Sequence, residues 1–135
     1  MQAIIRALVD LYDDAPSLAT SIGPLRTMQI AASQEPPYVI LSPVAGSGPD
    51  DTFGGSLHFE SLVVQFSIFD GSSAPDTILS YQELLYGRFD WAKLTYTQRA
   101  DILPLRCMRS TSGMLMKDPD GVWQISVDYL VEYQQ

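Results

Sequence analysis

The residue types best suited to catalysis in this 135-residue chain are its single histidine, His58, and its single cysteine, Cys107. A Cys–His or Ser–His pair needs a nucleophile and a base that meet in space, and such partners need not be close in sequence. No Gly-x-Ser-x-Gly motif is present, and nothing singles out two of the 16 carboxylates as an acid–base pair. We therefore interpret His58 as a surface residue at the start of a strand and Cys107 as a buried structural thiol.

A glycine-rich loop, AGSGPDDTFGGSLH from Ala45 to His58, invites a test for phosphate binding. Phosphate-binding loops run from a strand into a helix N-terminus and are often followed by Lys-Ser/Thr. This loop has strand-like runs on both sides and contains no lysine, and Asp50 and Asp51 would repel a phosphate. The pattern argues against nucleotide binding.

The aspartates were also considered as metal ligands. Asp118, Asp120 and Gly121 resemble the start of a calcium-binding loop, but the twelfth position is Tyr129, where a glutamate is required. The two aspartates of the glycine-rich loop have no companion carboxylate nearby in the sequence. We predict no catalytic residues, no cofactor and no metal site.

Charge is distributed unevenly along the chain, whose formal net charge is −8. This acidic balance disfavours a nucleic-acid-binding protein that works by phosphate neutralisation. Residues 88–117 nevertheless carry six of the eight basic residues and only two acidic ones, so this stretch is +4 and the remainder −12. These residues are either solvated surface charges or a basic surface that faces an acidic surface on a neighbouring copy or partner. The basic residues are Arg88, Lys93, Arg99, Arg106, Arg109 and Lys117.

The length predicts a single domain over residues 1–135. The apolar content of 46% favours a globular chain, and no run approaches the roughly 20 apolar residues of a membrane span. The first residues are interrupted by Arg6 and Asp10, which is atypical of a signal peptide. These features, with a single cysteine, favour a cytoplasmic protein.

In the first half of the chain, Ile4, Leu8 and Leu11 recur on one helical face, which predicts a helix over 2–13. Residues 17–24 are expected to form a loop or irregular turn. A strand is expected to start at Tyr38, directly after Pro36–Pro37. Residues 62–68 alternate with a period of two, and the opposite parity of two upstream apolar residues predicts a bulge or bend near residues 60–62.

The second half begins with a predicted helix whose buried face holds Ile78, Tyr81, Leu85 and Phe89 and which ends within 87–90. Ser73 and Asp76 have the spacing of a capping box, and Pro75 is expected in the first turn. Residues 91–101 are expected to form a loop with a short strand. The remainder predicts a hairpin, with extended residues 102–116, a kink at 112–113, a type I turn at 118–121 and a strand over 122–133.

These elements predict an α+β fold of order α-β-β-α-β-β. Two helices would pack on one face of a mainly antiparallel sheet with four strands or slightly more. Three methionines, Met108, Met114 and Met116, fall near the hairpin tip and suit either adaptable contacts or the core. The edges of such a sheet are templates for pairing with another copy.

The order and spacing of these segments resemble the tail-completion, or tail-terminator, proteins of long-tailed bacteriophages and related prophages. The resemblance covers nearly the whole chain. Its segments are the helix QAIIRALVDLYDD, the Pro-Tyr strand EPPYVILSPV, the strand-to-helix passage LVVQFSIFDGSSAPDTILSYQELL and the tryptophan-led strand GVWQISVDYLVEY.

The resemblance implies a virion structural protein that forms a ring, typically hexameric, at the head-proximal end of the tail tube. Such a ring ends tube polymerisation and joins the tail to the head connector proteins, and DNA passes its lumen without specific binding. It implies no catalysis, no cofactor and no membrane, with assembly in the host cytoplasm. Another head–tail neck component, such as a head-completion protein, and a small enzyme or ligand-binding domain remain alternatives.

A ring requires two different, complementary patches on each subunit. We expect the loop 46–56 to be loosely held in the isolated subunit and to become ordered against a neighbour or the tail tube, with Phe53 as its apolar anchor. The candidate assembly interface consists of Asp50, Asp51, Phe53, Arg106, Arg109, Met114, Met116 and Lys117.

Overall fold

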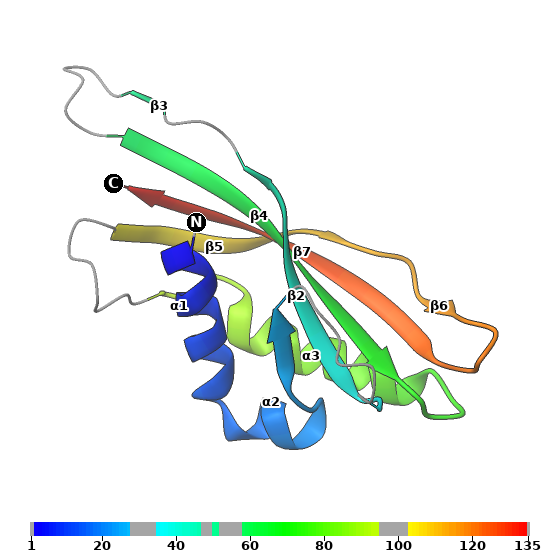
Figure 1. Ribbon diagram of the computed structural model, residues 1–135. Coiled ribbons are helices and arrows are strands. Elements are labelled where there is room, and N and C mark those ends of the chain that lie inside the picture. The colour runs from blue at the N-terminus through cyan, green and yellow to red at the C-terminus, as the bar shows by residue number, and fades with distance from the viewer. Residues whose placement is uncertain (1, 28–34, 47–49, 52–57, 95–102, 135) are drawn as a thin grey trace.

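The computed structural model describes residues 2–27, 35–46, 50–51, 58–94 and 103–134. Three helices and seven strands follow one another along these residues (Figure 1). In chain order they are α1 (Gln2–Asp13), α2 (Pro16–Ser21), β1 (Leu25–Thr27), β2 (Tyr38–Gly46), β3 (Asp50–Asp51), β4 (His58–Asp70), α3 (Asp76–Phe89), β5 (Leu103–Ser112), β6 (Met116–Lys117) and β7 (Trp123–Gln134).

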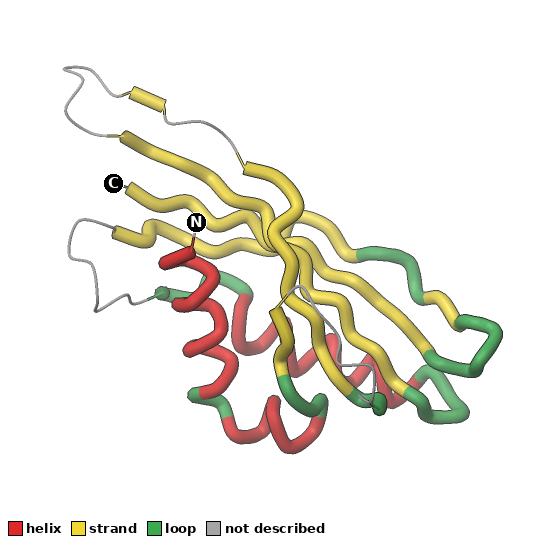
Figure 2. Tube along the Cα trace, viewed as in Figure 1, coloured by secondary structure: helices red, strands yellow, loops and turns green. Residues whose placement is uncertain are grey.

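The strands form one sheet in the order β1-β2-β4-β7-β5, with β3 paired to β4 and β6 paired to β7. The β1–β2 pair is parallel, and the other described pairs are antiparallel. The helices all lie on one side of this sheet (Figure 2). The predicted α+β class, with helices on one face of a mainly antiparallel sheet, is therefore confirmed. The predicted order of two helices and four strands is only roughly matched, because the described residues form three helices and seven strands.

The first helix has the predicted bounds, and its buried side packs Ile4, Leu8 and Tyr12 into the core with no exposed surface. The prediction of a loop at 17–24 was wrong for most of that range, because α2 occupies Pro16–Ser21. Proline suits the first turn of a helix, where its missing N–H has no intrahelical acceptor, and the fully buried Leu18 anchors this short helix.

A three-residue strand, β1, is an element that the sequence did not predict, because three residues are too few to show a period. The turn that leads into β1 depends on Gly23, whose φ of +95° lies in the left-handed region. A Cβ at this position would lie 2.3 Å from the carbonyl oxygen of Pro37. The Tyr12 hydroxyl donates a hydrogen bond of 2.7 Å to the Gly23 carbonyl, so this turn is tied to the first helix.

The strand expected after the two prolines is β2, which pairs with β4. The predicted bulge at residues 60–62 was wrong: β4 pairs with β7 in continuous register from Phe59 to Asp70. The irregularity lies instead in β2, between Pro43 and Ala45, and the intervening Val44 is 55% exposed. Proline has no N–H to donate to the ladder, so a bulge beside it sacrifices little pairing.

The third helix buries Ile78, Leu85 and Phe89 as predicted, together with Gln82. The predicted capping box was wrong, because Pro75 is the N-cap and no side chain caps the helix. Ser73 lies two residues before that cap, outside the position from which a capping side chain acts.

The C-terminal hairpin is confirmed. The N–H of Gly121 donates to the carbonyl of Asp118 at 3.0 Å, which closes the predicted turn. The first long strand of the hairpin ends at Ser112, at the predicted kink, and β6 resumes the pairing with β7. Alternate residues of β7 from Ile125 to Tyr133 are buried. The expected short strand within 91–101 lies mostly outside the described residues.

Aromatic side chains from three elements meet at the centre of the core. The ring of Phe66 on β4 lies 4.6 Å from that of Phe89 on α3 and 5.8 Å from that of Tyr129 on β7, measured between centroids. Buried aromatic pairs in tilted or edge-on arrangements contribute about 0.5–1.5 kcal/mol beyond the area they bury. This cluster fixes α3 on the sheet and so positions the residues that follow the helix.

Candidate functional site

The cysteine proposed as structural is enclosed in the core. Cys107 lies on β5 with no exposed surface, and burial, with a smaller effect of the Asp90 charge, raises its pKa to about 12. A nucleophilic thiol needs the opposite shift. His58 begins β4 as expected. Within the described ranges, no three His, Cys, Asp or Glu side chains lie close enough together to hold a metal ion.

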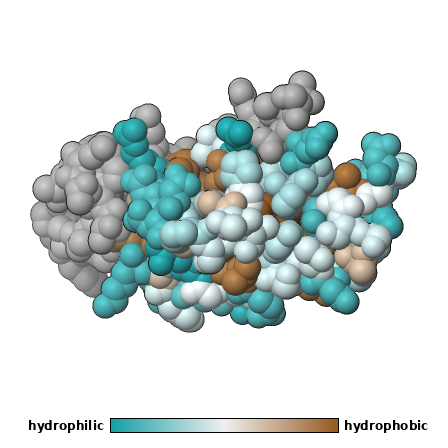
Figure 3. Space-filling model, turned by 90° about the horizontal axis from the view of Figure 1, so that it is seen from below, coloured by the Kyte–Doolittle hydropathy of each residue, from teal (hydrophilic) through white to brown (hydrophobic). Residues whose placement is uncertain are grey.

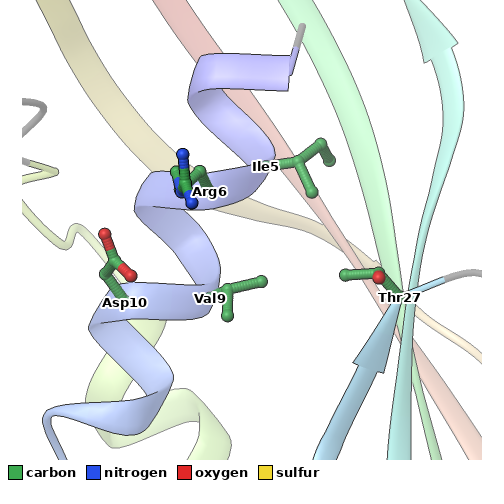
Figure 4. A pocket seen from close by; sticks show the side chains of 5 residues that line it. All are labelled: Ile5, Arg6, Val9, Asp10 and Thr27. Atoms are coloured by element: carbon green, nitrogen blue, oxygen red, sulfur yellow. The ribbon is translucent and has the colours of Figure 1, made fainter. Parts of the chain in front are cut away.

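A groove between α1 and β1 has a volume of about 440 Å³. Ile5 and Val9 point from the helix toward Thr27 on the strand, and Arg6 and Asp10 also line the groove (Figure 4). The lining therefore mixes apolar side chains with two oppositely charged residues spaced i and i+4, and it holds no nucleophile with an adjacent base. The groove offers a shallow contact surface of mixed polarity rather than a reaction centre.

A second groove, of about 320 Å³, lies between α2 and α3. Leu18 and Leu84 supply its apolar lining, and Glu83 and Arg88 supply charge. The Arg88 guanidinium is already held, because its Nε donates a 2.8 Å hydrogen bond to the carbonyl of Leu11. This bond ties the end of α1 to the end of α3.

The predicted interface residue Arg109 is part of an internal network. The Tyr129 hydroxyl donates to Asp90 Oδ1 at 2.7 Å, and the Arg109 guanidinium lies 3.4 Å from Asp90 Oδ2 and 3.7 Å from the centre of the Tyr86 ring. Burial, followed by the Asp90 hydrogen bond and charge, raises the pKa of Tyr129. Arg109 therefore joins α3 to β5, and part of its charge is compensated within the subunit.

Arg106 is also paired. Its Nε and a terminal nitrogen donate to the two carboxylate oxygens of Glu132 at 2.6 and 3.1 Å. The Arg106 side chain is half exposed, so solvent screens the pair and it contributes little to stability. The hydrogen bond to Glu132, and then its charge, raise the pKa of Arg106. Two of the six clustered basic residues are thus partly neutralised by acids of the same subunit.

The methionines of the hairpin are exposed rather than part of the core. Met114 is 80% exposed and Met116 is 52% exposed. The neighbouring Lys117 places its ammonium 5.0 Å from the centre of the Trp123 ring. Met108 is half-buried on β5. Of the two alternatives, adaptable surface contact therefore fits Met114 and Met116.

The predicted interface residues do not form one cluster. Asp50 and Asp51 form β3, which pairs with the first residues of β4. Met116 and Lys117 pair with the start of β7, which lies beside the last residues of β4. Because β4 has 13 residues, the two groups are separated by roughly 40 Å along the strand. Phe53, and most of the loop proposed as a docking arm, lie outside the described residues.

One exposed residue was missed by sequence reasoning. Trp91 follows the C-cap of α3, is 69% exposed and has a φ of +58°. A bulky residue in the left-handed region is a genuine backbone outlier. Its only sequence signal was a tryptophan placed immediately after a predicted helix end.

On the surface that the helices form, apolar side chains appear as separate small patches among hydrophilic ones (Figure 3). None of the helices in the described part of the chain is long and apolar enough to cross a membrane. The surface therefore offers local anchors rather than one broad hydrophobic plane.

Comparisons with known proteins identify a fold relative. No protein-family model matches the chain, and no curated protein matches it in sequence. A solved structure described as the virion of a native gene transfer agent particle contains a chain with a TM-score of 0.71 and 8% identity. The match covers 93% of this chain and 90% of that one. This protein therefore shares its fold, over nearly its whole length, with a chain of that virion particle.

Proposed function

We propose that this protein is a structural component of a phage-like virion that caps the head-proximal end of the tail tube. In this role it forms a ring, typically hexameric, that ends tube polymerisation and provides the joint to the head connector. The observation that carries the proposal is the fold shared with a chain of a gene transfer agent virion over nearly the full length of both chains.

Other features support a role in assembly. The most exposed large apolar side chains, among the described residues, lie on the hairpin and directly after α3, where they are available to other proteins. The cysteine lacks the exposure and lowered pKa of a nucleophile. The segments that resemble tail terminators correspond to α1, β2, the β4–α3 passage and β7.

The experiment combines the purified protein with a polymerising tail-tube protein from the same genome. We expect rings by light scattering and negative-stain microscopy, and tubes that carry a ring at one end and stop growing. Binding to the connector without binding to tube ends would instead favour the second candidate, a head-completion protein. A chain that stays monomeric with both partners would contradict both assembly roles.

A further inference from the structure

Trp91 combines an unfavourable backbone conformation with a largely exposed side chain. Its φ of +58° is strained for any residue with a Cβ, and 69% of its surface is in water. Exposed tryptophans at the centre of interfaces are frequent binding hot spots. A strained φ and an apolar side chain that is mostly in water are both unfavourable in the isolated subunit. Together they point to a contact of Trp91 with another molecule.

The surroundings of Trp91 are basic. Lys93 is exposed two residues further on, and Arg88 precedes the end of the helix. Asp90 is the acidic residue of this segment, and it is already engaged by Arg109 and the Tyr129 hydroxyl. An approaching acidic surface would therefore find the exposed Lys93 two residues from Trp91.

The hairpin tip, residues 114–120, is complementary to the surface around Trp91 because it is apolar and carries acidic residues. Met114 and Met116 are its exposed apolar side chains, and Asp118 and Asp120 are exposed in the turn that follows. The single lysine of this tip, Lys117, is held over the Trp123 ring. The tip is therefore apolar and net acidic.

The two surfaces lie at different positions along the sheet of one subunit. Trp91 follows Asp90, the C-cap of α3, and Asp90 lies beside Arg109, which pairs with Tyr129 on β7. The hairpin tip lies where β6 pairs with the start of β7 (Figure 1), and Trp123 at that start is roughly 20 Å from Tyr129 along the strand. A contact between different patches of identical chains is heterologous, and such contacts build rings when the rotation closes.

We propose that Trp91 of one copy packs between Met114 and Met116 of the next copy, with Lys93 facing Asp118 and Asp120. Thioether sulfurs make favourable contacts with aromatic rings, and the opposite charges set the orientation of the approach. This contact rests on the proposed ring function and specifies which two surfaces of the chain meet in it.

Disulfide trapping tests the contact directly. Lys93→Cys and Asp120→Cys are introduced together, so that Trp91 and both methionines stay in place, and the protein is oxidised mildly at a concentration at which it assembles. The native thiol of Cys107 is fully buried, so it does not compete. We expect a ladder of covalent oligomers from the double variant, and none beyond dimers from either single variant.

Charge reversal provides the matched test. We expect Lys93→Glu and Asp120→Lys each to raise the concentration needed for half-assembly at least tenfold, and the double variant to restore most of the loss. Trp91→Gly is expected to abolish assembly while its melting temperature stays equal or rises, because glycine accepts a φ of +58° without strain.

The outcomes separate the contact from the proposed function. Rings that form on the wild-type chain without the covalent ladder and without charge-reversal rescue would overturn this contact and leave the tail-terminator role standing. A wild-type chain that forms no oligomer with or without tube protein would overturn both.

Discussion

At the scale of single residues, the charged and aromatic side chains of the basic stretch have separate roles. Arg106 and Arg109 are compensated by Glu132 and Asp90 of the same subunit, whereas Lys93 and Trp91 are exposed. The net charge of the segment therefore overstates the charge available to a partner. Antiparallel pairing places Glu132 of β7 beside Arg106 of β5, and the end of α3 places Asp90 beside Arg109.

The thiol of Cys107 gives a residue-scale prediction. Burial raises its pKa from 9.0 to about 12, so an aromatic disulfide reagent at pH 8 should label the native protein on the order of a thousandfold more slowly than the urea-unfolded protein. Cys107→Val supplies the unlabelled control. Rapid labelling of the native chain would contradict the enclosed position.

The same shift predicts the direction of a pH effect on stability. The unfolded chain loses the thiol proton above about pH 9, whereas the folded chain keeps it to about pH 12. The contribution of this group to the free energy of unfolding is therefore constant below pH 9 and falls as the pH rises from 9 to 12. In urea titrations, Cys107→Val should reduce this alkaline loss of stability, and an unchanged slope would contradict the assignment.

At the scale of elements, long amphipathic segments follow their sequence periods and short ones depend on contacts. The alternation of β7 and the helical face of α3 predict most of the buried residues, although the predicted Tyr81 is half-buried and the neighbouring Gln82 is buried. The three-residue β1 instead depends on Gly23 and on the N–H of Val39, which donates to the carbonyl of Pro24 at 3.1 Å. Its existence is decided by β2, which lies beside it.

Two glycines provide a matched pair of element-scale predictions. Gly23→Ala should lower the free energy of unfolding by at least about 2 kcal/mol, because the left-handed φ is strained and the new Cβ would meet Pro37. Gly87→Ala should raise it by about 0.5–1 kcal/mol, because Gly87 lies within α3 and has open space around its Cβ position. Chemical denaturation measures both, and equal effects would contradict the local geometry.

At the scale of the whole molecule, the two ends of the sheet carry different features. The start of β4, with β3 beside it, lies at one end, and the hairpin tip with its exposed methionines lies at the other. The exposed methionines that we propose for the contact between copies therefore lie at the end of the sheet opposite β3.

The glycine-rich loop carries the whole-molecule prediction. Deleting residues 49–54 removes β3, but β4 keeps its continuous pairing with β7, so the melting temperature should change by only a few degrees while termination of tubes is lost. Circular dichroism and microscopy of tube ends measure the two effects. Normal termination by the deletion variant would show that the loop is only a connector.

Sequence reasoning located most of the fold and only part of the candidate site. Periodicity placed α1, α3, β4 and β7, because burial repeats with the geometry of each element, whereas it left open whether the hairpin methionines are exposed or in the core. The bulge at Val44, the helix at 16–21 and the role of Pro75 as N-cap were missed. Each of these depends on local hydrogen bonding that leaves no period in the sequence.

The sequence by itself determined which residues are apolar, where helices and strands alternate, and that the chain has no obvious catalytic motif. Only the tertiary structure decided which charges face each other, that Cys107 is enclosed, and that Trp91 remains in water at the end of α3 opposite the hairpin tip. The physical reason is that periodicity reports which face of an element is buried. Partner identity and the spatial relation of two distant segments depend on how the elements pack together.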